Sequence, residues 1–348
     1  MLDEVTQRRL LEKLEREGGE VFISALRNPD VIEVMRNSDG RLWADFSGVG
    51  MKCLGEMAAS RAESILSTCA SMLGTALTRE SPILEGEFPL DGSRLQGLIP
   101  PLSSTTVFAI RKKAIKVFTL ADYIDNGILA EHPDTQEDFL SQVASPDGRH
   151  AESAMWSSLS LAARLEWAIR EKMNILVVGG TGSGKTTLAN ALLHSLSQQC
   201  PHDRIVAIED TMELQVRVEN AVLLRASEQV PMSRLLRATM RLRPDRIIVG
   251  EVRGGEAYTL LKSWNSGHPG GLATIHANSA EEGLDKLSQY IFEAPDARNF
   301  SHDMVGRMIA STVNVVVFIA RTSMAPGRQV KQVLRVRGFR EGRFVFEG

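Results

Sequence analysis

The sequence contains few cysteines and no long apolar run. Its three cysteines, Cys53, Cys69 and Cys200, are scattered along the chain. They form neither a C-x-x-C pair nor the spacing of metal ligands, which argues against a cysteine-based metal site and fits the reduced thiols of the cytoplasm. The longest apolar segment, residues 313–320, is broken by Asn314 and is far shorter than the roughly 20 residues that span a bilayer.

A strong excess of either charge is also missing. The net charge of -3 and the pI near 6.2 create no general attraction to nucleic acid or to an anionic membrane. The first residues, Met1 to Val5, lack the positive start and the apolar stretch of a signal peptide. We therefore expect a cytoplasmic protein, either fully soluble or peripheral on the cytoplasmic face of a membrane. The length of 348 residues suggests two domains.

The segment 179–187, GGTGSGKTT, carries the clearest chemical signal. It matches G-x-x-x-x-G-K-[ST] between a strand-like apolar run, 175–178, and a helix-like segment, 188–193. Glycines let the backbone turn consecutive N–H groups inward, which makes an anion-binding nest at a helix N-terminus. We expect Lys185 to act as the catalytic cation on the β- and γ-phosphates of ATP, and Thr186 to bind Mg²⁺. The expected nucleotide-binding residues are Gly180, Thr181, Gly182, Ser183, Gly184, Lys185, Thr186 and Thr187.

The first part of the chain, residues 1–131, predicts an α+β domain with an antiparallel sheet. Its expected helices cover 4–16, 55–78 and 120–129, and its expected strands cover 31–35, 41–45, 83–88, 93–98 and 106–111. Residues 132–152 concentrate turn formers and polar residues and therefore predict a linker.

The second part, residues 153–348, alternates strands and helices and predicts an α/β ATPase domain. Several strands are continuously apolar, as expected for a sheet covered on both faces. The expected strands are 175–178, 204–208, 222–224, 246–249, 272–275 and 313–318, followed by a hairpin of 332–336 and 343–346. The expected helices are 153–172, 188–193, 233–242, 255–264, 280–292 and 304–311.

Two of these strands end in carboxylates. Glu209 and Asp210 follow one strand, and Glu251 follows another. Acidic residues at the carboxyl ends of parallel strands face the crevice where ligands bind, so each glutamate could hold a metal-bound water or orient the attacking one. A carboxylate that caps the next helix is the alternative at either position. Gly250 stands where a P-loop enzyme usually has its magnesium-shell acid, which leaves the division of roles between Glu209 and Glu251 open.

Three further segments, in this order after the phosphate loop, resemble motifs of the type II/type IV secretion traffic ATPases. The segment 204–214, RIVAIEDTMEL, is similar to their aspartate box, and 242–256, LRPDRIIVGEVRGGE, to their Walker B segment. The segment 267–279, GHPGGLATIHANS, is similar to their histidine box. The resemblance covers about residues 80–320. The Gly-His-Pro-Gly-Gly form looks most like the conjugative transfer ATPases of type IV secretion.

This resemblance implies roles for individual residues. Glu209, with Glu213 as a second acid, belongs to the aspartate box, and Glu251 is the Walker B glutamate. His276 is expected to sense the γ-phosphate, although spacing alone favours a structural histidine at such a position. His268 has the weaker claim, because Gly-His-Pro-Gly also fits a plain turn.

The resemblance further implies a RecA-like core, a homohexameric ring and nucleotide bound between the two domains. Arg111 matches the N-terminal-domain arginine that reaches the nucleotide, and Arg94 is a weaker companion. A basic cluster on one side of the predicted helix 233–242 is either a solvated face or the source of an arginine finger or intersubunit contact. Its members are Arg234, Arg237, Arg241 and Arg243.

We therefore interpret the sequence as a hexameric motor that hydrolyses ATP with Mg²⁺ and powers a conjugative type IV secretion machine through its inner-membrane components. A type II secretion or type IV pilus motor is one alternative, and a nucleotide-gated assembly switch with little turnover is another. The two glutamates and His276 favour turnover, because binding alone needs only the phosphate loop. The acidic net charge and the lack of a basic, aromatic-interleaved strand argue against a translocase that contacts nucleic acid directly.

Overall fold

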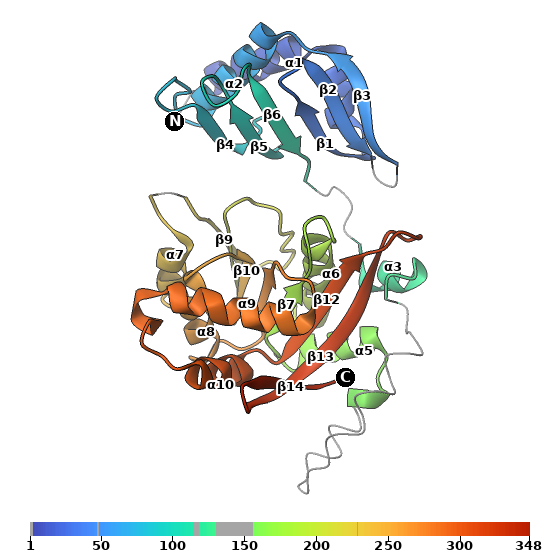
Figure 1. Ribbon diagram of the computed structural model, residues 1–348, viewed down its shortest axis with the longest axis vertical. Helices are drawn as coiled ribbons and strands as arrows, with labels where there is room; N and C mark the ends of the chain where they lie inside the picture. The colour runs from blue at the N-terminus through green and yellow to red at the C-terminus, as the bar shows by residue number, and fades with distance from the viewer. Residues whose placement is uncertain (1–2, 47–48, 114–117, 130–155, 228) are drawn as a thin grey trace, which may run out of the picture. The chain divides into compact units, whose positions relative to one another are not determined.

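The chain folds into two compact units, Met1–Lys116 and Val117–Gly348. The structure, a computed structural model, describes residues 3–46, 49–113, 118–129, 156–227 and 229–348 (Figure 1). The predicted linker, 132–152, lies outside the described residues. Leu120, Tyr123, Ile128 and Leu129 pack in the same core as the second unit's sheet, so the boundary between the units falls earlier than the predicted residue 131.

The first unit is a six-stranded antiparallel sheet covered by two helices. The sheet order is β3-β2-β1-β6-β5-β4, with β1 Val31–Arg36, β2 Arg41–Phe46, β3 Gly50–Glu56, β4 Ile83–Glu87, β5 Arg94–Leu98 and β6 Val107–Arg111. The helices are α1 Glu4–Arg27 and α2 Ala59–Met72. Their buried residues, such as Phe22 and Ile65, share one core with Val34 and Ile110 of the sheet. This confirms the predicted antiparallel α+β class.

Two predicted helices of this unit differ from the structure. The first helix does not stop at residue 16 but continues to Arg27, across a break at Gly19 where φ is 72°. The predicted helix 55–78 is wrong at both ends, because α2 covers only Ala59–Met72 and residues 50–56 form β3. Pairing with β2, for example Trp43 opposite Cys53, provides β3 with backbone partners that local sequence preference does not reveal.

The second unit contains an eight-stranded mixed sheet of order β14-β13-β12-β7-β11-β10-β8-β9. The strands from β12 to β9 in this order are parallel to their neighbours, and β13 and β14 form the antiparallel edge. Their bounds are β7 Ile175–Val178, β8 Ile205–Glu209, β9 Ala221–Arg225, β10 Arg246–Val252, β11 Leu272–Ile275, β12 Val315–Arg321, β13 Arg328–Arg340 and β14 Arg343–Glu347.

Helices cover both faces of this sheet (Figure 1). They are α3 Leu120–Asp125, α5 Leu161–Arg170, α6 Lys185–Gln199, α7 Met232–Thr239, α8 Glu256–Trp264, α9 Ala280–Glu293 and α10 His302–Thr312, with the short η2 Pro295–Ala297. Alternate residues of one strand serve opposite cores: Val177 packs with Leu188 of α6, and Val178 packs with Leu284 of α9. Two buried faces explain why the central strands are apolar throughout, and they confirm the predicted α/β core.

Within the described ranges, every helix is too short or too polar to traverse a lipid bilayer. All three cysteines are free thiols.

Candidate active site

Four neighbouring strands bring the predicted motifs to one edge of the sheet. Strands β7, β11, β10 and β8 are adjacent in this order. The phosphate loop follows β7, His276 follows β11, Glu251 lies near the end of β10, and Glu209 ends β8. Because these strands are parallel, their carboxyl ends meet at the same edge. Motifs that are far apart in the sequence thus form one row.

Glycines shape the phosphate loop for close contact. Gly182 and Gly184 have φ values of 67° and 98°, a left-handed conformation that other residues rarely adopt. A Cβ at Gly179 would lie 2.4 Å from Ser183 Oγ and 2.5 Å from the Ile319 carbonyl oxygen, so no side chain fits there. Helix α6 begins at Lys185 without a side-chain cap, which leaves the first-turn N–H groups directed at a ligand position.

A chain of contacts joins three of the predicted catalytic residues. Lys185 is only 7% exposed, and its Nζ donates to the Gly180 carbonyl oxygen at 3.1 Å. The same ammonium lies 3.3 Å from Nδ1 and 3.2 Å from Nε2 of His276. His276 Nε2 is 2.7 Å from Glu251 Oε1. A proton on Nε2 lets His276 donate to Glu251 and leaves Nδ1 to accept from Lys185. The histidine therefore connects the phosphate-loop lysine to the carboxylate of β10.

Arg253 holds Glu251 from the other side. Its Nε donates to Glu251 Oε2 at 2.7 Å, and its Nη1 donates to Asp210 Oδ2 at 2.6 Å. Partial burial opposes the charge of the guanidinium, but the nearby carboxylates of Glu251 and Asp210 outweigh it and raise the Arg253 pKa. The sequence reading did not assign Arg253 a role. Its spacing of two residues from Glu251, which puts both on one side of an extended chain, was the available signal.

Glu209 is a buried acid, 2% exposed. Its Oε1 accepts hydrogen bonds from the N–H groups of Glu213 and Leu214, both at 2.9 Å. Its Oε2 is buried and has no hydrogen-bonding partner among the described residues. Burial raises the Glu209 pKa to about 7, although the two N–H donors pull it down. This carboxyl group can therefore exchange a proton near neutral pH.

The position of Glu209 gives a physical reason for Gly250. A Cβ at residue 250 would lie 2.8 Å from Glu209 Cγ and 3.2 Å from its Oε1. An aspartate at Gly250 would therefore collide with the acid of the neighbouring strand. The missing carboxylate on β10 and the buried carboxylate on β8 are two sides of one arrangement.

The site fits Mg²⁺ held mainly by phosphate oxygens. No group of three or more His, Cys, Asp or Glu side chains in the described parts of the chain could hold a metal by itself. Mg²⁺ bound with a nucleotide usually needs few protein ligands, because phosphates and waters complete its octahedron. Thr186, in the first turn of α6, and the unpartnered oxygen of Glu209 supply the oxygen chemistry that this ion prefers.

A buried amide fixes the segment that holds Glu209. Asn190 on α6 is 2% exposed; its Nδ2 donates to the Glu213 carbonyl oxygen at 3.1 Å, and its Oδ1 accepts from the Gln215 N–H at 2.8 Å. Asn190 was not singled out from the sequence. A polar residue inside an otherwise apolar helix was the signal. His268, by contrast, contacts the Pro244 carbonyl oxygen through Nδ1 at 2.9 Å, as in a turn.

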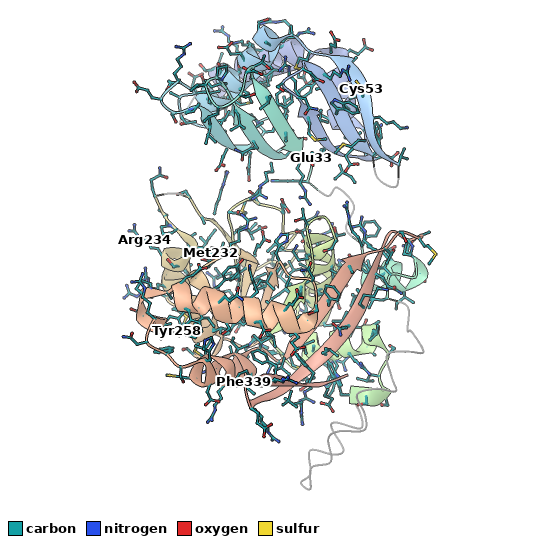
Figure 2. The ribbon with its side chains drawn as sticks, viewed as in Figure 1. Glu33, Cys53, Met232, Arg234, Tyr258 and Phe339 are labelled. Carbon is teal, nitrogen blue, oxygen red and sulfur yellow. The ribbon has the colours of Figure 1, made fainter. Side chains whose placement is uncertain are left out.

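Arg111 and Arg94 belong to the first unit, where they lie opposite each other on β6 and β5. Glu33 is the cross-strand partner of Arg111, and Glu87 that of Arg94. The four residues form a row of two cations flanked by two acids (Glu33 is labelled in Figure 2). The charge of Arg111 opposes the effect of burial, which raises the Glu33 pKa.

The basic cluster near α7 is not one helix side. Only Arg234 and Arg237 lie on α7, which ends at Thr239 rather than at the predicted residue 242 (Figure 2). Arg241 and Arg243 follow the helix, and Arg243 has a left-handed φ of 52°. The extended backbone that precedes β10 replaces the last predicted turn. All four arginines are exposed.

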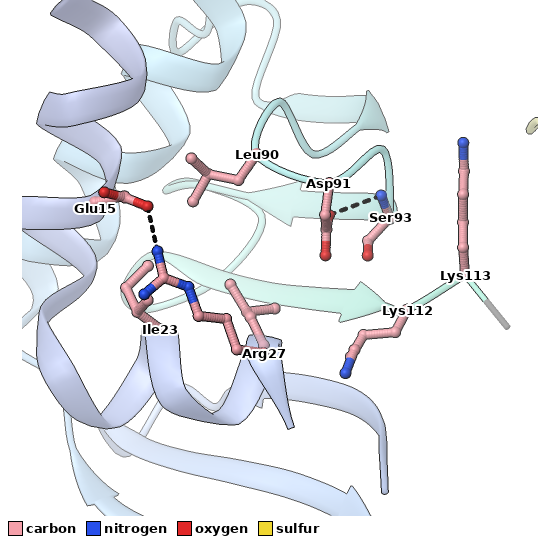
Figure 3. Close-up of a pocket in the computed structure, with 9 residues that line it drawn as sticks. Glu15, Ile23, Arg27, Leu90, Asp91, Ser93, Lys112 and Lys113 are labelled. Carbon is pink, nitrogen blue, oxygen red and sulfur yellow. Dashed lines mark hydrogen bonds and ion pairs between the residues drawn. The ribbon is translucent and has the colours of Figure 1, made fainter. Parts of the chain in front are cut away.

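A recess of about 310 Å³ lies in the first unit and contains none of the phosphate-site residues. Its walls are Glu15, Ile23, Leu26, Arg27, Leu90, Asp91, Ser93, Lys112 and Lys113 (Figure 3). Arg27 is paired with Glu15 at 2.6 Å, and Lys112 donates to the Asn28 carbonyl oxygen. Because these cations already have partners, the recess offers little free charge to a ligand.

Comparison with known proteins identifies similar chains. The family model described as "Type II/IV secretion system protein" matches residues 156–338. A probable conjugal transfer protein TrbB of Sinorhizobium fredii is 41% identical over 339 residues, 97% of this chain and 93% of that protein. The conjugal transfer protein TrbB of Rhizobium radiobacter is 40% identical and covers 97% of this chain and 94% of its own length. The VirB11 ATPase from the Brucella suis type IV secretion system, solved with sulphate, aligns at a TM-score of 0.51 with 26% identity, over 95% of this chain and 97% of that one.

Proposed function

The chain belongs to the type II/IV secretion system protein family, and from this premise we propose that it is the ATP-hydrolysing motor of a conjugative type IV secretion system. The observation that carries the hydrolytic activity is the contact chain from Lys185 through His276 to Glu251, with Glu209 on the next strand. Conjugation is favoured over a pilus or type II motor because the 41% and 40% identical relatives are named conjugal transfer proteins.

Binding of ATP rearranges the contacts of Lys185. The phosphate loop and the start of α6 direct N–H groups toward the β- and γ-phosphates, and the Lys185 ammonium exchanges the Gly180 carbonyl and His276 for phosphate oxygens. His276 then loses its cationic neighbour while it keeps Glu251. The position of His276 therefore depends on whether a γ-phosphate occupies the site, which makes it the sensor.

The two glutamates have different chemistry. Glu209, with a pKa of about 7, can accept a proton from the attacking water near neutral pH. Glu251 is compensated by Arg253 and His276, which suits a fixed charge that orients water rather than a base. Mg²⁺, when bound, neutralises charge on the phosphate oxygens, and the Thr186 hydroxyl with one of these carboxylates would hold it.

The remaining parts of the proposal rest on the family. We assign Arg111 to the nucleotide of the same chain, and one of the exposed arginines at or after α7 to a neighbouring subunit in a homohexamer. Inner-membrane components of the secretion machine are the expected partners, which places the protein at the cytoplasmic face of that membrane. Movement of the first unit on ATP binding would deliver the work.

A steady-state ATPase assay of Glu251→Gln tests hydrolysis. We expect a loss of about 100-fold or more in turnover with ATP binding retained, because the change removes a charge next to the reacting phosphate but leaves the phosphate loop intact. Glu219→Gln, an exposed acid before β9, is the matched control and should behave as wild type. Equal, near-zero rates for wild type and Glu251→Gln would instead support a nucleotide-gated assembly switch.

A further inference from the structure

Two arginines of the β12–β13 hairpin lie against the phosphate loop. Arg321 ends β12, Arg328 begins β13, and the two are direct cross-strand partners. Arg321 Nε donates to the Gly182 carbonyl oxygen at 3.2 Å. A Cβ at Gly184 would lie 2.8 Å from Arg328 Nη1 and 3.2 Å from its Cδ. Both contacts therefore fall on the glycines with left-handed backbone.

The Arg321 contact acts on a peptide group that faces the ligand position. The carbonyl of Gly182 and the N–H of Ser183 belong to one planar peptide and point in opposite directions. The Ser183 N–H donates at 3.3 Å to the Gly180 carbonyl oxygen, the same oxygen that accepts from Lys185. The N–H thus points into the loop, while Arg321 binds the carbonyl from outside. A cation at the carbonyl end orients and polarises this dipole toward an anion.

The two arginines also restrict a flexible segment. Glycine has more accessible backbone conformations than any other residue, so a glycine-rich loop loses entropy when it closes around phosphates. Contacts at Gly182 and Gly184 hold both residues in the conformation that the loop has here. Less ordering then remains to be done when a ligand binds, which raises affinity.

We propose that Arg321 and Arg328 are positioning residues that preorganise the phosphate loop for the polyphosphate of the nucleotide, Arg321 through the Gly182–Ser183 peptide. The proposal rests on the proposed function, because it requires that this loop bind a nucleotide. It assigns the arginines to the polyphosphate and not to the base. The loss on substitution is therefore independent of the base.

The test is calorimetric binding of ADP, GDP and inorganic pyrophosphate to the full chain. Arg321→Met should weaken all three by the same factor of about fivefold, the effect of a partly exposed charged contact. Arg321→Lys should recover part of the affinity, since it keeps the charge but not the planar guanidinium. Arg340→Met is the matched control: Arg340 is exposed and ends the same strand that Arg328 begins, and its substitution should change nothing.

Two results would overturn the proposal: unchanged affinities in Arg321→Met, or a loss for ADP that GDP and pyrophosphate do not share, which would show a base contact instead. Arg321 is exposed, so its variants should unfold at the wild-type temperature without ligand. Arg328→Met supplies a second variant, with the same base-independent loss expected. Lys185→Ala separates the two levels of inference, because ADP binding that survives this change contradicts the nucleotide site itself.

Discussion

Glu209 is the residue whose protonation links the site to the stability of the fold. Its pKa of about 7 in the folded chain exceeds the ordinary value of 4.5. The folded state therefore binds this proton more tightly than the unfolded state does. The resulting stabilisation is complete below about pH 4.5 and is lost as the pH rises through about 7.

Glu209→Gln should remove this dependence. Between about pH 5 and about pH 8 the wild type should lose roughly 2 kcal/mol of unfolding free energy through this group, and the variant should not, because glutamine does not titrate. Urea unfolding at the two pH values, without nucleotide, measures the difference. Glu219→Gln should retain the wild-type decline. An identical decline in Glu209→Gln would show that the burial of Glu209 has no energetic cost.

The residues that could be predicted from the sequence are those with a local signature. Lys185 lies in a motif, and Glu209, Glu251 and His276 follow apolar strands, so the rule for strand ends places them together. Arg253 lacks such a signature, because its importance comes from contacts with two different strand ends. Which side chains meet depends on the strand order, and the spacing of residues along the chain does not determine that order.

At the scale of elements, the contact between α8 and β11 sets the depth of the site. Gly271 immediately precedes β11, and a Cβ there would lie 2.0 Å from Trp264 Nε1 on α8. That indole N–H donates to the Ile247 carbonyl oxygen of β10 at 3.1 Å, and Trp264 is 3% exposed. The helix therefore packs directly on the two strands that lead to His276 and Glu251.

Gly271→Ala should destabilise the protein by about 3 kcal/mol, because neither the buried indole nor the strand can move away without losing contacts. Chemical denaturation measures the change. Gly338→Ala on β13 is the matched control, since nothing lies within 4 Å of its Cβ position and no large effect is expected. A similar stability for both variants would mean that the sheet and α8 separate easily.

Elements with a strong hydrophobic pattern were predictable, and those defined by pairing were not. The apolar strands β7, β8 and β10 stand within one or two residues of their predicted bounds on the side that precedes the site. The exposed β3 has no inward-facing apolar pattern and exists because β2 offers a free edge. Similarly, the short helix α3 was expected, but its sequence alone does not say which core its Leu120 and Tyr123 join.

For the whole molecule, the proposal requires that the first unit contribute to turnover in the second. Arg111→Ala should lower the ATPase rate of the full chain by about tenfold while the hexamer and the unfolding temperature stay as in the wild type, because Arg111 is exposed and its loss leaves no buried charge. Sedimentation and thermal unfolding monitor these controls. Arg41→Ala, an exposed arginine on β2, should retain the wild-type rate. If Arg111→Ala did so as well, nucleotide closure by the first unit would be contradicted.

The place of β7 in its sheet has a consequence for how the protein is made. Strand β7 pairs with β11 on one side and with β12 on the other, although both follow it by many residues in the chain. These are contacts of high sequence separation, which form late and slowly. During synthesis the phosphate loop leaves the ribosome long before the strands that flank it. A nascent chain that already contains every nucleotide motif therefore cannot yet hold a nucleotide, and ligand-assisted folding can begin only once β12 has emerged.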